Sequence, residues 1–104
     1  MEGDALETIP ALEGPFGLLF VDASKGEYER YIELAEPLLS ERCVLVVDNL
    51  LMSGEVALPD GAETRWPPDS LVSARTLNAG LLESERWLAC VLPVGDGIGF
   101  GARR

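Results

Sequence analysis

The sequence contains no histidine, a single lysine and only two cysteines. Without histidine, the chain has no imidazole metal ligand and no histidine-activated nucleophile. Cys43 and Cys90 lack the spacing of a metal or redox motif, and each lies in an apolar run, which predicts two buried thiols. No apolar run approaches the length of a membrane span, and the acidic start is unlike a secretory signal. These absences predict a soluble cytoplasmic protein with no membrane partner.

Basic residues are also scarce. The chain has 8 of them against 18 acidic residues, and its net charge of −10 argues against nucleic acid as a partner. Hydrophobic residues make up 47% of the sequence, which is too many for a disordered chain. With 104 residues, the chain has the length of one domain, which we expect to span residues 1–104.

The periodicity of the apolar residues predicts an α/β fold with a mixed sheet of about four strands, flanked by helices. Two apolar runs are typical of fully buried parallel strands, and Asp96-Gly97 predicts the tight turn of an antiparallel C-terminal hairpin. The expected elements are a short helix or turn over 4–12 capped by Asp4, a strand over 16–22, an amphipathic helix over 26–39, a strand over 43–49, a helix capped by Asp69 or Ser70 that runs to about residue 82, and strands over 87–92 and 98–102.

The stretch 52–68 is rich in proline and glycine and is interpreted as a long loop, which in a compact domain is usually functional. It contains an isolated tryptophan, Trp66. Two interpretations of this side chain stay open: it either anchors the loop or forms a wall of an acceptor pocket.

Polar side chains follow the two buried strands. Asp22 ends the first strand and Asp48-Asn49 ends the second, while Lys25 follows Asp22 by three residues. Open α/β sheets bind ligands outside the carboxyl ends of their strands, so these side chains are expected to lie together at one sheet edge. Carboxylate and amide oxygens are the ligands that Mg²⁺ and Ca²⁺ prefer, which predicts a divalent-cation site with Lys25 nearby.

Two other interpretations of these residues exist. An Asp-Asn pair after a strand often does no more than cap backbone amides in a turn. Phospho-acceptor switch domains also group aspartates and a lysine around Mg²⁺, but they need an acidic pair after the first strand and a lysine after a later one. The order found here, with Lys25 close behind Asp22, fits that class poorly.

The sequence resembles the cation-dependent class I O-methyltransferases, the family of catechol and caffeoyl-CoA O-methyltransferases. The residues that carry this resemblance form blocks in family order, and the combination is specific although each block alone is weak. The blocks are Gly3-Asp4-Ala5-Leu6-Glu7, Phe20-Val21-Asp22-Ala23-Ser24-Lys25 with Tyr28 and Tyr31, Val47-Asp48-Asn49-Leu50-Leu51 with Gly54 and Val56, and Leu92-Pro93 with Gly95-Asp96-Gly97.

The resemblance implies a Rossmann-like methyltransferase sheet and roles for particular residues. Asp22, Asp48 and Asn49 match the positions that ligate the divalent cation. Lys25 matches the usual candidate for the general base beside the acceptor hydroxyl. The cofactor, S-adenosylmethionine, is assigned to Asp22 and to the block that lies near its adenine, Gly3, Asp4 and Ala5.

The sequence departs from the family at its start. The glycine-rich loop after the family's first strand is absent, so the chain resembles the C-terminal half of a methyltransferase. The glycines from Gly95 to Gly101 do not replace that loop, because no helix follows them. The strand over 16–22 would then have a bare apolar edge. We expect the chain to form a homodimer or to pair with a missing N-terminal half.

Two functions from different classes follow. The first is an S-adenosylmethionine-dependent, metal-assisted O-methyltransferase, or its C-terminal part, acting on a small hydroxylated and catechol-like acceptor. The second is a catalytically inactive truncated homologue that serves as an oligomeric interaction or structural module. Binding of S-adenosylmethionine distinguishes the two.

Overall fold

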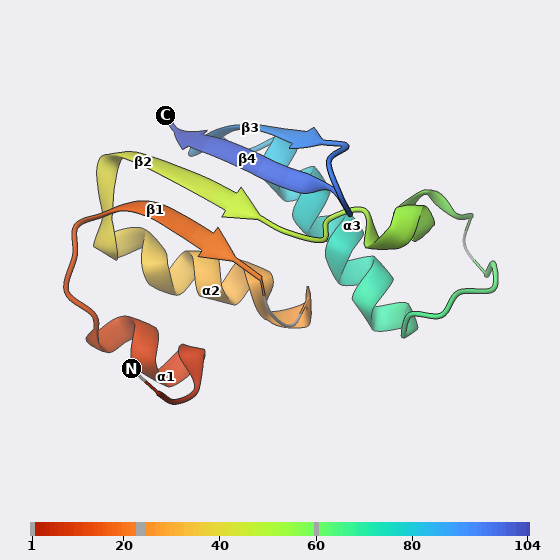
Figure 1. Ribbon diagram of the computed structural model, residues 1–104, viewed down its shortest axis with the longest axis horizontal. Coiled ribbons are helices and arrows are strands. Elements are labelled where there is room, and N and C mark those ends of the chain that lie inside the picture. The colour runs from red at the N-terminus through yellow and green to blue at the C-terminus, as the bar shows by residue number, and fades with distance from the viewer. Residues whose placement is uncertain (1, 23–24, 60) are drawn as a thin grey trace.

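The computed structural model describes residues 2–22, 25–59 and 61–104. It forms a four-stranded sheet with helices packed against it (Figure 1). The elements in chain order are α1 (Ala5–Thr8), η1 (Ile9–Ala11), β1 (Phe16–Val21), η2 (Lys25–Glu27), α2 (Tyr28–Ala35), η3 (Glu36–Leu38), β2 (Leu39–Val47), η4 (Met52–Ala57), α3 (Pro68–Leu82), β3 (Trp87–Leu92) and β4 (Ile98–Arg103), where η marks a 3-10 helix.

The strands lie in the order β1-β2-β4-β3. β1 and β2 are parallel, with Val21 opposite Val47, whereas β4 is antiparallel to both of its neighbours. Because a parallel pair needs a crossover, α2 connects β1 to β2. The loop over residues 93–97 closes the β3–β4 hairpin. The predicted mixed α/β sheet with a C-terminal hairpin is confirmed.

The core lies between one face of the sheet and the helices. Alternate residues of β2, such as Leu45 and Val47, are fully buried there, as is Tyr28 from α2. The buried side chains of Leu77 and Leu81 from α3 belong to the same cluster. Residues of α1 pack against the same cluster. Figure 1 shows α1 and α2 beneath β1 and β2, and α3 behind the hairpin. Each ~100 Å² of apolar surface that folding buries contributes about 2.5 kcal/mol, and most of the largest fully buried side chains lie in this layer.

The opposite face of the sheet has large exposed apolar side chains on three of its four strands. Leu18 and Phe20 in β1 are 60% and 57% exposed, Leu88 in β3 is 63% exposed and Phe100 in β4 is 43% exposed. The prediction of a fully buried strand over 16–22 is therefore wrong, since only Val21 of β1 is buried. The prediction for Cys90 is also wrong: it pairs with Phe100 and is exposed, whereas Cys43 is buried.

Two predicted boundaries differ from the structure near Pro37. The helix expected over 26–39 ends as α2 at Ala35, and the 3-10 turn η3 follows. Pro37 has no amide hydrogen to continue the α-helical pattern, which explains the early end. β2 consequently begins at Leu39, which pairs with Phe16, instead of at residue 43.

The other helix ends agree with the sequence only in part. Asp4 caps α1 as predicted, because its Oδ1 accepts a hydrogen bond of 2.8 Å from the amide of Leu6. The long helix α3 begins earlier than predicted, at Pro68, and its N-cap is Pro67, not Asp69 or Ser70. A proline at the first helical position is pre-set for helical φ, so no side-chain cap is needed. Within the described residues, no helix is long and apolar enough to cross a membrane.

Candidate metal and methyl-transfer site

The parallel pairing of β1 and β2 brings Asp22 and Asp48 to the same edge of the sheet. Val21 and Val47 are paired, and the amide of Asp48 donates a hydrogen bond of 3.0 Å to the carbonyl of Val21. Neighbouring strands lie about 4.8 Å apart, so this pairing brings the backbones of Asp22 and Asp48 close together at that edge. Asp22 is exposed and Asp48 is half-buried, which keeps the edge open to ligands.

Asn49 follows in a left-handed conformation with φ of 61°. Asparagine tolerates this region better than most residues. The amide of Asn49 donates to Oδ1 of Asp48 at 2.7 Å, and its side-chain Nδ2 donates to Oδ2 of Asp96 at 3.3 Å. Two carboxylates and one amide oxygen at a sheet edge form a donor set that suits a hard divalent cation. Among the described residues, no group of three or more His, Cys, Asp or Glu could hold a metal ion, and the metal site over Asp22, Asp48 and Asn49 stays a prediction.

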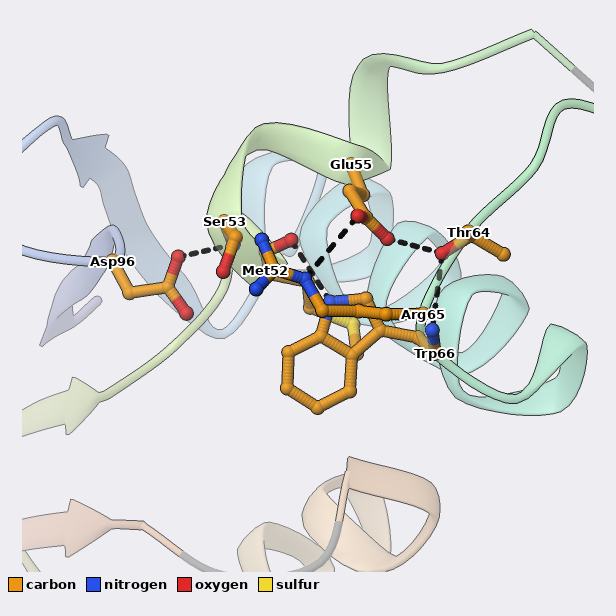
Figure 2. A network of polar contacts seen from close by, with 7 residues as sticks. All are labelled: Met52, Ser53, Glu55, Thr64, Arg65, Trp66 and Asp96. Atoms are coloured by element: carbon orange, nitrogen blue, oxygen red, sulfur yellow. Dashed lines mark hydrogen bonds and ion pairs between the residues drawn. The ribbon is translucent and has the colours of Figure 1, made fainter.

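Asp96 is a site neighbour for which the sequence predicted no role at the site, although it lies in the predicted hairpin turn and in a block of the family resemblance. Its Oδ1 accepts a hydrogen bond from the amide of Ser53, drawn in Figure 2, and its carbonyl accepts one of 3.0 Å from the amide of Leu51. The carbonyl of Gly97 accepts another of 3.1 Å from the amide of Leu50. An Asp-Gly pair is common in any hairpin turn, so the pair by itself does not indicate a contact with the loop after β2.

Lys25 begins η2, three residues beyond Asp22. Its side chain lies outside the part of the chain that the structure describes, so its role as a base stays a prediction. Tyr31, six residues further along the chain, is a poor alternative base. Its hydroxyl donates a hydrogen bond to Glu27, and this bond to the carboxylate, with burial, raises the pKa of Tyr31 to about 12.

The block Gly3-Asp4-Ala5 forms the start of α1. Gly3 has a φ of 134°, a conformation that side chains rarely adopt, and Asp4 makes the cap described above. α1 packs beside α2 and does not contact the strand ends through any described hydrogen bond. Its assignment to the adenine of the cofactor therefore remains a prediction.

The contacts of Trp66 distinguish between its two interpretations, a loop anchor and a wall of an acceptor pocket. The indole Nε1 donates a hydrogen bond of 3.2 Å to the carbonyl of Met52, and the ring packs with the buried Met52 side chain (Figure 2). Glu55 in η4 holds the same segment by accepting a hydrogen bond from Thr64 and lying 3.4 Å from Nε of Arg65. Trp66 thus anchors the loop, and no described contact gives it a role in a pocket wall.

Comparisons with known proteins identify relatives of this chain. The O-methyltransferase family matches residues 1–104. Caffeoyl-CoA O-methyltransferase 2 of Zea mays is 36% identical over 107 residues, a match that covers 93% of this chain and 39% of the maize protein. The chain therefore spans less than half the length of this relative.

Two solved structures are similar in fold. The S-adenosylhomocysteine-bound methyltransferase PaMTH1 of Podospora anserina is 32% identical with a TM-score of 0.83, and the match covers 100% of this chain and 48% of that one. The O-methyltransferase TomG of Streptomyces achromogenes, solved with S-adenosylmethionine, is 28% identical with a TM-score of 0.78 and is matched over 97% of this chain and 47% of its own.

The sheet order, the helix-covered face and these matches define a Rossmann-like methyltransferase fold, of which the chain forms about half the length. The chain belongs to the O-methyltransferase family.

Proposed function

We propose that this chain is the metal- and acceptor-binding part of an S-adenosylmethionine-dependent O-methyltransferase that acts on a small hydroxylated, catechol-like acceptor. The observation that carries the proposal is the hydrogen bond between the amide of Asp48 and the carbonyl of Val21, because it sets Asp22 and Asp48 side by side. Family membership and the cofactor-bound relatives support the choice of S-adenosylmethionine.

In this proposal, Asp22, Asp48 and the amide oxygen of Asn49 hold the divalent cation. A bound cation lowers the pKa of coordinated hydroxyl groups and fixes their position. The exposed Asp22 leaves room for two neighbouring acceptor oxygens at the open edge. Lys25 accepts the proton of the reacting hydroxyl, and the start of α1 binds near the adenine. Orientation of the two reactants supplies much of the rate acceleration.

The test is the binding of a catechol to the purified chain with and without Mg²⁺, measured by isothermal titration calorimetry. We expect binding that depends on Mg²⁺ and that is lost in Asp48→Ala. Glu85→Ala, an exposed acidic residue in the turn after α3, is the matched control and should bind as the wild type does. Catechol affinity that is unchanged by Mg²⁺ or by Asp48→Ala would refute the proposal.

The exposed sheet face favours a second candidate, an oligomeric interaction module. Six large side chains, each about half exposed and ~200 Å² in extent, present on the order of 600 Å² of apolar surface, which is at the upper end for a monomer. They are Phe16, Leu18, Phe20, Leu88, Leu92 and Phe100. A standard interface covers about 800 Å² on each partner, so pairing two such faces is feasible in a homodimer.

Light scattering at micromolar concentration tests this second candidate. A mass of about twice 11.2 kDa is expected for a homodimer. A mass that matches a monomer would refute the independent interaction module. The exposed face would then be expected to pack against the rest of a full-length methyltransferase fold.

A further inference from the structure

Asp96 in the β3–β4 turn helps to hold the loop that follows β2. Asp96 contacts three of the five residues from Asn49 to Ser53: the side chain of Asn49, the amide of Leu51 and the amide of Ser53. Three residues of this loop, Asn49, Met52 and Ser53, have positive φ values between 48° and 61°. Non-glycine residues adopt this region at a cost, so the loop needs contacts that hold it.

The chemistry of the Asp96 contact fixes which way the Asn49 amide faces. A carboxylate offers only acceptors, so the atom of Asn49 that lies 3.3 Å from Oδ2 must be the donor, Nδ2. The amide oxygen then lies on the other branch of the side chain. We propose that Asp96 is a positioning residue that keeps Asn49 turned with its oxygen available to the divalent cation. The inference rests on the proposed metal site.

An aspartate side chain suits position 96, because its two carboxylate oxygens can accept hydrogen bonds from two donors at once. Oδ1 accepts from the amide of Ser53 and Oδ2 accepts from Asn49. Asparagine at position 96 keeps the shape but has one oxygen. If that oxygen stays with Ser53, an amide NH₂ faces Asn49, and Asn49 must rotate to present its own oxygen to it. The cation would then lose a ligand.

The β3–β4 turn lies very close to the loop that follows β2, which supports a specific contact between Asp96 and Asn49. Leu50 and Leu51 donate backbone hydrogen bonds to the carbonyls of Gly97 and Asp96 at 3.1 and 3.0 Å. A Cβ atom on Gly97 would lie 2.4 Å from Cγ of Leu51, so only glycine permits this distance. Groups that orient metal ligands are worth about tenfold to hundredfold in metal affinity.

The experiment compares four forms of the chain. The first is the wild type, and the second is Asp96→Asn. The third is the control Asp69→Asn, which makes the same charge change at an exposed position in the first turn of α3. The fourth is the double variant Asp96→Asn with Asn49→Asp, which exchanges donor and acceptor and so restores the pairing. Mn²⁺ affinity is measured by calorimetry, and the side-chain amide signal of Asn49 is followed by NMR in the metal-free chain.

We expect Asp96→Asn to weaken Mn²⁺ binding about tenfold to hundredfold. We expect Asp69→Asn to leave it unchanged and the double variant to recover most of it. In the metal-free wild type, the Asn49 amide protons should exchange slowly with water, and this protection should be lost in Asp96→Asn.

The outcomes separate the inference from the proposed function. Equal Mn²⁺ affinity in the wild type and Asp96→Asn, or no recovery in the double variant, would overturn the positioning role alone. A wild type that shows the protected Asn49 amide but no Mn²⁺ binding at millimolar concentration would refute the metal site, and with it the role of Asp96 in serving that site.

Discussion

Replacing Gly97 with alanine adds a single methyl group. We expect this change to lower the free energy of unfolding more than most changes of that size in this chain. Gly97 lies where the hairpin turn meets the loop after β2, and its φ is +85°. The added Cβ would lie 2.4 Å from Cγ, 3.0 Å from Cδ1 and 3.0 Å from the backbone N of Leu51. Because the last of these is a backbone atom, rotation of the Leu51 side chain cannot relieve the whole clash.

The expected loss of unfolding free energy is the sum of two separate costs. Alanine in the left-handed region costs about 1–2 kcal/mol, and overpacking of a tight contact costs about 1–3 kcal/mol more. Together they reach roughly 2–5 kcal/mol, which is a large part of the ~5–15 kcal/mol that stabilises a typical domain. With a urea slope of about 1.5 kcal/mol per molar, the unfolding midpoint should fall by roughly 1–3 M.

Urea unfolding followed by circular dichroism measures this change. Gly95→Ala is the matched control, because Gly95 lies in the same turn with φ of +55° but has no atom within 4 Å of an added Cβ. It should show the conformational cost alone. Equal midpoints for Gly97→Ala and Gly95→Ala would refute the close approach of the turn to Leu51, and with it the physical support for the position of Asp96.

Two further predictions concern groups away from the turn. The bond to Glu27 stabilises the protonated Tyr31 in the folded chain, so the stability difference between the wild type and Tyr31→Phe should be complete below the ordinary tyrosine pKa of about 10 and should disappear as the pH rises toward 12. Urea unfolding across this pH range checks it, and a constant difference would contradict it. Phe100→Glu should abolish self-association measured by light scattering, whereas Val72→Glu, an exposed change on α3, should leave it intact; equal masses for both variants would place the contact elsewhere.

The strands and the hairpin turn were predicted well, because each of them is specified by residues that are close together in the sequence. The apolar runs ending in Asp22 and Asp48 and the Asp96-Gly97 turn each specify one element, and all of these elements are present. The end of α2 was missed because Pro37 acts on hydrogen bonding one turn earlier. The exposure of Leu18 and Phe20 was missed because an apolar run does not tell whether anything covers its second face.

The candidate site was predictable only in part. Asp22 and Asp48 could be placed together because parallel strands align their carboxyl ends, and the pairing of Val21 with Val47 confirms that alignment. The contact of Asp96 with Asn49 was not predictable from the sequence, because it joins the side chains of residues that are 47 positions apart. Only the packed structure brings the hairpin turn onto the loop after β2.

The most direct test of the metal site is a Mn²⁺ titration of the isotope-labelled chain followed by NMR, since bound Mn²⁺ broadens the signals of nearby nuclei. We expect the backbone signals of Asp22, Asp48 and Asn49 to broaden first, at substoichiometric Mn²⁺. Broadening that begins instead on the acidic surface of α2, around Glu29 and Glu33, or that spreads evenly over the chain, would contradict the account.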